Sequence, residues 1–98
     1  MFIKLFKLNK KWNAGEHDYY LSEITINSSK IVYMAEDVES ISLLREGKIN
    51  LSLHEAASFT KIKLSSAHGS PEQIVVVGNP NLIEQKILRS SSRQLLRD

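Results

Sequence analysis

The sequence predicts a mainly β domain with one C-terminal helix, built as a small five- or six-stranded barrel or as a rolled antiparallel sheet that the helix covers. Apolar and polar residues alternate over several short segments, and turn residues recur about every ten positions. A helix start signal follows the last of these segments. At 98 residues, we expect a single domain, 1–98, with one modest core.

The first expected strand covers residues 2–8. A turn at 13–15 separates it from a second strand at 19–26, whose apolar residues recur on one face. A polar turn at 27–29 leads into a strand at 31–34. Because that turn is short, the second and third strands are expected to form a hairpin.

The middle of the chain is ambiguous over residues 36–46. Val38, Ile41 and Leu44 are spaced as in a short helix, although part of the same stretch also suits a strand. Alternation returns at 48–54, where a further strand is expected.

The clearest unit is the hairpin that follows. Ile62 and Leu64 alternate with lysines, as in a strand with one buried face. Residues 66–72 supply glycine and proline for a turn, and 74–77 form a β-branched run suited to burial. This pattern predicts a β-hairpin that forms part of the core.

A helix is expected directly after the hairpin. Asn79 is placed to cap it, and Pro80 suits the first helical position, where its missing N–H is not needed. Three apolar residues are expected to face the sheet, namely Ile83, Ile87 and Leu88. Residues 90–98 are expected to be a tail that is mobile or held by a partner.

The composition is that of an ordinary globular protein, with 42% hydrophobic and 24% charged residues. The chain has no cysteine, which excludes disulfides, thiolate nucleophiles and cysteine-bound zinc. Lys4 and Lys7 interrupt the apolar N-terminus, so we expect no signal peptide there, and no apolar run reaches transmembrane length. We therefore expect a cytoplasmic protein that does not bind membranes.

Charge is distributed unevenly along the chain. Residues 1–11 carry a net charge of +4, residues 12–60 carry −5 and residues 61–98 carry +3. The sequence predicts a single basic patch if the two ends meet in space, and a mixed solvated surface if they do not.

The residues that could carry catalysis are scattered. The histidines lie in separate predicted elements without metal-ligand spacing: His17, His54 and His68. One acidic cluster, favoured as a charged turn over a cation or acid/base site, comprises Glu36, Asp37 and Glu39. No nucleophile motif accompanies them. We therefore expect no enzymatic activity, no metal and no cofactor.

Basic side chains are the better binding candidates. Two share the wet face of a predicted strand, and four follow one stripe of the C-terminal helix. These partner- or nucleic-acid-binding candidates are Lys61, Lys63, Lys86, Arg89, Arg93 and Arg97. An ordinary solvated helix face is an equally good interpretation of the stripe.

The order of these signals resembles the FlbD (SwrD) flagellar family of small bacterial proteins. The matching residues are Ile3, Leu5, Leu8, Asn9, Tyr20, Ile24 to Ile26, Thr60 to Leu64, Gly69, Val75 to Val77 and Ile83 to Ile87. Residues 36–58 would be an insertion. The resemblance implies a noncatalytic accessory or regulatory protein and no site residue. Short uncharacterised bacteriophage proteins are similar to this chain in amino-acid composition.

The function that we expect is that of a noncatalytic interaction domain, which binds a protein partner or itself, in a bacterial or phage-infected cell. The apolar strand surface at 49–53 and 74–77 leads us to expect a homo-oligomer. The alternative is a nucleic-acid-binding module that uses the basic residues.

Overall fold

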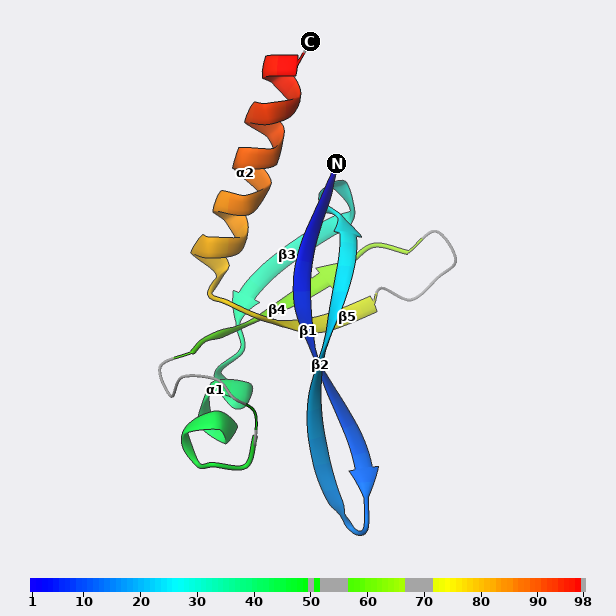
Figure 1. The fold of residues 1–98 in the computed structure, drawn as a ribbon, viewed down its shortest axis with the longest axis vertical. Helices are drawn as coiled ribbons and strands as arrows, with labels where there is room; N and C mark the ends of the chain where they lie inside the picture. Colours follow the sequence, from blue (N-terminus) through cyan, green and yellow to red (C-terminus); the bar gives the residue numbers. More distant parts are fainter. Residues whose placement is uncertain (50, 52–56, 67–71, 98) are drawn as a thin grey trace.

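The sheet has five antiparallel strands in the order β2-β1-β5-β4-β3 (Figure 1). The computed structural model describes residues 1–49, 51, 57–66 and 72–97, with side chains up to residue 89. The sheet does not close, because β2 and β3 stand at its two ends. The expected mainly β fold is confirmed, in the form of a rolled sheet with a C-terminal helix.

β1 (Phe2–Asn13) and β2 (Glu16–Asn27) form the longest ladder, in which every residue of one strand has a partner on the other. The expected strands at 2–8 and 19–26 are confirmed as parts of this ladder. Both continue to a two-residue turn, so they are longer at that end than alternation alone predicts.

The expected hairpin between the second and third strands is wrong. After β2 the chain forms a 3-10 helix (Ser28–Lys30), and the Ser28 amide donates to the Met1 carbonyl at 2.9 Å. β3 (Ile31–Glu36) then pairs with β4 (Phe59–Leu64) at the far end of the sheet. The 3-10 helix redirects the chain, so the two strands that it joins end as opposite edges.

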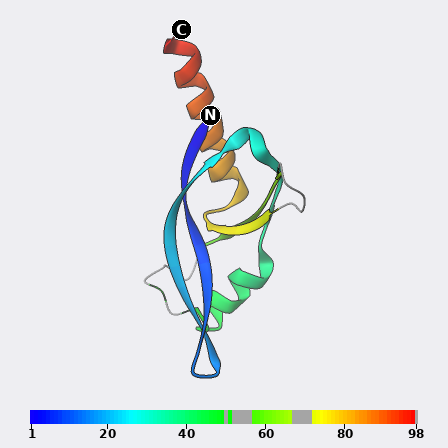
Figure 2. The ribbon, with the colours of Figure 1, turned by 90° about the vertical axis from the view of Figure 1, so that its right-hand side faces the viewer.

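β4 and β5 (Glu72–Val77) form the expected hairpin, with Ile62 opposite Ile74. Residues 67–71 of the connecting turn lie outside the described residues. β5 meets β1 at one register pair, Lys7 opposite Val76. The β1–β2 pair therefore crosses β5 and continues away from it (Figure 2).

α2 (Pro80–Arg97) begins as expected, because the Leu82 amide donates to Asn79 Oδ1 at 2.9 Å. Ile83 is 1% exposed and Ile87 packs beside it, so this face of the helix covers the sheet. Leu88 is 57% exposed, which corrects its expected inward orientation. Each residue advances about 100° around a helix, so Leu88 is turned away from the face that Ile87 occupies.

The first core lies between α2 and one face of the sheet. Its buried members are Ile3, Leu5, Ile26, Ile62, Ile74, Val76 and Ile83. Since alternate residues of a strand point to opposite faces, Lys61 and Lys63 project from the other face. The strand alternation expected around Ile62 is therefore confirmed.

A second core lies on that other face, under α1 (Val38–Arg45), which settles the ambiguous segment as a helix. Its buried members are Ile41, Leu44, Ile49 and Phe59. Among the residues expected in a strand at 48–54, Lys48, Ile49 and Leu51 are not in one, and the others lie outside the described residues. Ile49 is buried by packing beneath α1 instead of by strand pairing.

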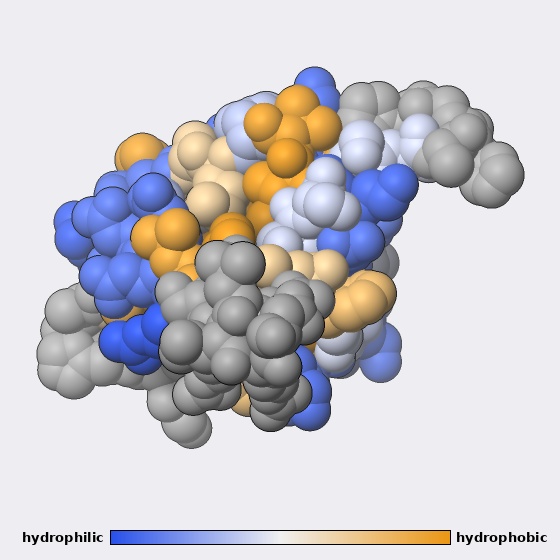
Figure 3. Space-filling view, turned by 90° about the horizontal axis from the view of Figure 1, so that it is seen from above, coloured by the Kyte–Doolittle hydropathy of each residue, from blue (hydrophilic) through white to orange (hydrophobic). Residues whose placement is uncertain are grey.

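The molecule is elongated, with principal extents of 52 × 33 × 19 Å. Its radius of gyration is 14.8 Å, compared with about 13 Å for a compact domain of this length. α2 and the β1–β2 turn project from opposite ends (Figures 1 and 2). Around the emerging helix, hydrophobic and hydrophilic surface are interspersed (Figure 3). None of the helices in the described part of the chain has the length and apolarity needed to cross a membrane.

Candidate interaction site

The β1–β2 pair ends in an exposed ribbon, residues 10–18, which we call the arm (Figure 1). Its turn has Ala14 at φ 52° and Gly15 at φ 85°, the two positive values of a type I′ hairpin. Trp12 is 65% exposed and packs edge-on against His17, with ring centroids 4.8 Å apart. A projecting ribbon that displays an indole is a surface suited to contact with another molecule.

Among the strands that the structure describes, none lies on the outer edge of β2. In a two-residue hairpin, Asn13 and Glu16 next to the turn exchange backbone hydrogen bonds, and bonded and non-bonded pairs then alternate along the ladder. The N–H and C=O groups of every second β2 residue therefore point away from β1. These outward residues are His17, Tyr19, Leu21, Glu23 and Thr25.

The two edges of the sheet differ in how they are protected. β3 has six residues, and its register shifts between Ile31 and Tyr33, which leaves Val32 59% exposed. Short length and such irregularity discourage the addition of another strand. β2 has twelve residues, a regular register, and no proline or lysine. Of the two edges, β2 is the one suited to receive a further strand.

A groove of about 570 Å³ runs beside the arm half of this edge. One wall is β2 from Glu16 to Tyr19, and the other comprises Leu43, Gly47 and Lys48 around the end of α1. The Lys48 ammonium lies 3.5 Å from Glu46, so its charge is partly compensated within its own wall. The groove adjoins four of the twelve residues of β2.

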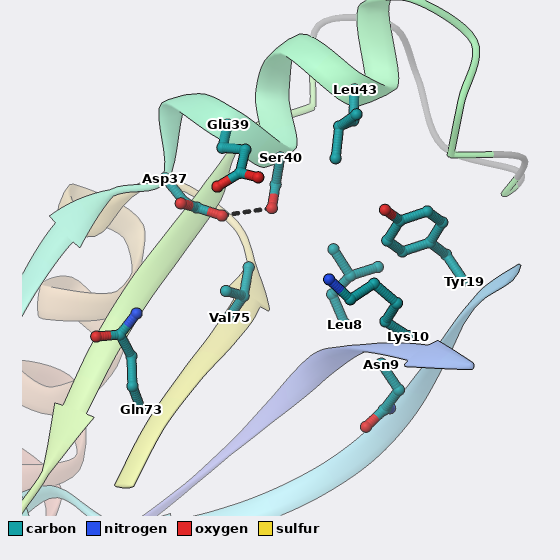
Figure 4. A pocket seen from close by; sticks show the side chains of 10 residues that line it. All are labelled: Leu8, Asn9, Lys10, Tyr19, Asp37, Glu39, Ser40, Leu43, Gln73 and Val75. Atoms are coloured by element: carbon teal, nitrogen blue, oxygen red, sulfur yellow. Dashed lines mark hydrogen bonds between the residues drawn. The ribbon is translucent and has the colours of Figure 1, made fainter. Parts of the chain in front are cut away.

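A second pocket, of about 230 Å³, lies between β1, β5 and α1 (Figure 4). Leu8, Leu43 and Val75 provide apolar walls. The Ser40 hydroxyl donates to the Asp37 carboxylate at the start of α1. Glu39 joins them, so two of the three residues of the expected acidic cluster line one cavity.

Glu16, His17 and Asp18 line the groove beside the arm. None of the described residues that line the pocket of Figure 4 is a histidine, so the Ser40 hydroxyl has no imidazole base beside it. Within the described part of the chain, no three histidine or acidic side chains gather as potential metal ligands. His17 is exposed on the arm, and His54 and His68 lie outside the described residues.

The predicted basic residues fall into two groups on opposite faces of the sheet. Lys61 and Lys63 are half-buried in β4, and the Lys63 ammonium lies 5.9 Å from the centroid of the Tyr33 ring. Lys86 and Arg89 are exposed on α2. Arg93 and Arg97 belong to the same helix, but their side chains are outside the described ones.

The two basic ends of the chain do meet. Lys86 Nζ donates to the Lys4 carbonyl oxygen at 3.4 Å, so α2 contacts the start of β1. Lys10 and Lys11 lie in the arm at the other end of the molecule, and Lys61 and Lys63 lie on the opposite face of the sheet.

Sequence reasoning did not identify the β2 edge as a site. The signals were a turn that can form a tight hairpin, a lone tryptophan before it, and a strand without basic residues after it. These features indicate an exposed edge only once the order of the described strands places β2 at the end of the sheet.

No family model, curated protein or solved structure matches the chain.

Proposed function

We propose that this chain is a noncatalytic interaction domain that binds an extended segment of a protein partner as a further strand on β2. The observation that carries the proposal is the unprotected outer edge of β2, which is regular along its whole length. Main-chain hydrogen bonds supply affinity in strand addition, and side-chain pockets beside the edge supply selectivity. The groove beside Glu16 to Tyr19 offers such a pocket.

The pocket of Figure 4 supports binding in preference to chemistry. Its serine hydroxyl and one of its carboxylates already bond to each other, and its apolar walls suit an inserted side chain. Tyr19 and Leu43 line both this pocket and the groove, so the two cavities are neighbours.

The test is a selection of displayed random peptides, as long as β2, on the full chain. Glu23→Pro removes one outward N–H and leaves the β1 ladder intact, because Glu23 and Phe6 form a non-bonded pair. The matched control is Glu23→Ala, which removes the same carboxylate and keeps the N–H. We expect selected peptides to bind the wild type and Glu23→Ala, and to lose at least about tenfold in affinity for Glu23→Pro.

The amide NMR spectrum locates the bound peptide. We expect the largest shifts at the outward amides of His17, Tyr19 and Leu21. Selected peptides that ignore Glu23→Pro and shift other amides would refute strand addition at β2, as would a selection that enriches nothing.

A second copy of this chain is another partner to test. Of the described residues that suggested self-association, Ile49, Ile74 and Val76 are buried in the two cores. β2 is the remaining regular edge for a copy to use. Light scattering tests this: a dimer that Glu23→Pro converts to a monomer would place the second copy on β2, and a monomeric wild type would remove it.

Nucleic-acid binding is a second candidate function, favoured by the contact between Lys86 and Lys4 that joins the two basic ends. Single-stranded oligonucleotide binding should then fall steeply with salt. Lys86→Glu with Arg89→Glu should abolish it, whereas Lys61→Glu with Lys63→Glu, on the opposite face, should weaken it less. Binding that is absent at low salt would exclude this candidate.

A further inference from the structure

Charge is segregated between the two strands of the arm-bearing hairpin. β1 carries four lysines and no acid, whereas β2 carries three acids and neither lysine nor arginine. The acids of β2 are Glu16, Asp18 and Glu23. β2 therefore presents negative charge to whatever strand lies beside it.

β1 shows which pattern of residues pairs with β2. Lys11 lies directly opposite Asp18, and the Lys4 ammonium lies 3.9 Å from the Glu23 carboxylate. Between these charges, the one apolar pair is Leu8 opposite Leu21, and the other β1 residues there are Lys7, Asn9 and Lys10. The inner neighbour of β2 thus places lysines near the acids and a leucine opposite Leu21.

The outer edge offers the same side chains to an added strand, because each β2 residue keeps its face of the sheet and can pair across both edges. Two of the acids, Glu16 and Asp18, also line the groove beside that edge. The Asn13 side-chain Nδ2 donates to Asp18 Oδ2 at 2.9 Å, which holds this carboxylate on the arm. The Glu16 side chain is exposed there.

We infer that the partner segment is a lysine- or arginine-bearing extended strand, which runs antiparallel to β2 with its basic residues near Glu16 and Asp18 and aliphatic residues near Leu21. This inference rests on the proposed strand addition. It gives that addition a chemical class, a basic amphipathic segment.

The negative charge of β2 disfavours acidic strands at its outer edge, including a second copy of β2. A second copy of β2 would add three acids and no basic residue to an edge that already carries three acids, and an acidic segment would also lack basic residues. Like charges opposite each other destabilise a pair of strands, and opposite charges stabilise it. The edge therefore discriminates by charge among extended segments of equal apolar content.

The experiment uses three labelled peptides and the full chain. The first has the sequence of residues 2–13, FIKLFKLNKKWN, which already pairs with β2 on its inner side. In the second and third, the four lysines are replaced by glutamine and by glutamate. We expect the basic peptide to bind about tenfold more tightly than the glutamine peptide at low salt, and the glutamate peptide to bind weakest.

Two variants of the chain complete the test. Glu16→Gln combined with Asp18→Asn keeps the edge and removes two charges, so it should bind the basic and glutamine peptides nearly equally. Glu23→Pro should weaken all three peptides, which distinguishes outer addition from exchange with β1.

Equal binding of the three peptides to the wild type would overturn the charge inference while leaving strand addition intact. No binding of the basic peptide would also overturn it. The peptide selection above decides strand addition independently, because it imposes no charge on the peptides.

Discussion

The β1–β2 ladder passes through two different environments along one continuous pair of strands. At one end Ile3, Leu5 and Ile26 are buried against α2 and the rest of the sheet. At the other end every residue of the arm is exposed. The first half is held by the burial of apolar surface, and the second by backbone pairing and a tight turn. The buried half of the hairpin therefore stabilises the fold, and the exposed half is the part that the proposed strand addition would use.

The largest expected effect is in the buried half of the molecule. Ile62→Asp or Val76→Asp places an unpaired charge in the first core, which costs several kcal/mol of a total stability of roughly 5–15 kcal/mol. We expect either variant to be unfolded by circular dichroism. The control, Lys61→Asp, changes a half-buried residue on the opposite face and should stay folded. A wild-type melting temperature for Ile62→Asp would show that this core does not hold the fold.

A smaller loss is expected at the start of α2. Asn79→Ala removes the side-chain oxygen that caps the Leu82 amide, so the free energy of unfolding should fall by about 1 kcal/mol. Asn81→Ala changes an exposed asparagine of the same helix and is the matched control. Denaturant titration measures both. Equal losses in the two variants would mean that the cap contributes nothing specific.

Substitutions in the turn of the arm should change the stability of the arm alone. Ala14 adopts a left-handed conformation that is strained for a residue with a Cβ, and Ala14→Asn creates the Asn-Gly pair favoured in type I′ turns. Amide exchange at Lys11 and Asp18 should slow for Ala14→Asn and accelerate for Gly15→Ala. The global melting temperature should change little in either variant, because the arm contributes no residue to the buried cores. Parallel changes in melting temperature would show that the arm and the body unfold together.

The smallest effect on folding is expected at the tip. Trp12→Ala should change the free energy of unfolding by less than about 0.5 kcal/mol, since the side chain is exposed. Trp12 is the sole tryptophan, so the native emission should be that of a solvated indole and should shift to shorter wavelength when a partner covers the arm. Emission typical of a buried indole in the free protein would contradict the exposed arm.

Several elements follow from local sequence. Alternation around Ile62, the β-branched run at 74–77 and the Asn79-Pro80 helix start each act within a few residues, and each is present where expected. The turn after Asn13 is local as well. These features were predictable because each depends on residues that are close together in the sequence. Burial on one face requires alternation, a helix cap requires a side-chain oxygen, and proline fixes its own φ.

The incorrect predictions concern segments whose structure depends on contacts with residues that are distant in the sequence. The segment at 31–34 has strand character whichever strand it joins, and its pairing with β4 depends on residues far away in sequence. Ile49 looked like part of an amphipathic strand, but a buried isoleucine fits equally well beneath a helix. Alternation predicts that a side chain is buried, but it does not predict which element covers that side chain.

The sequence by itself determined a mainly β chain with one capped C-terminal helix, a tight turn before β2, and the separation of basic from acidic residues along the first hairpin. Only the tertiary structure decided that β2 is an edge, that the arm stands free, and that Lys86 reaches Lys4. The physical reason is the distance along the chain over which each interaction acts. Propensity and capping act between neighbours in the chain, whereas an edge is created by the strands that pair elsewhere and leave it without a partner.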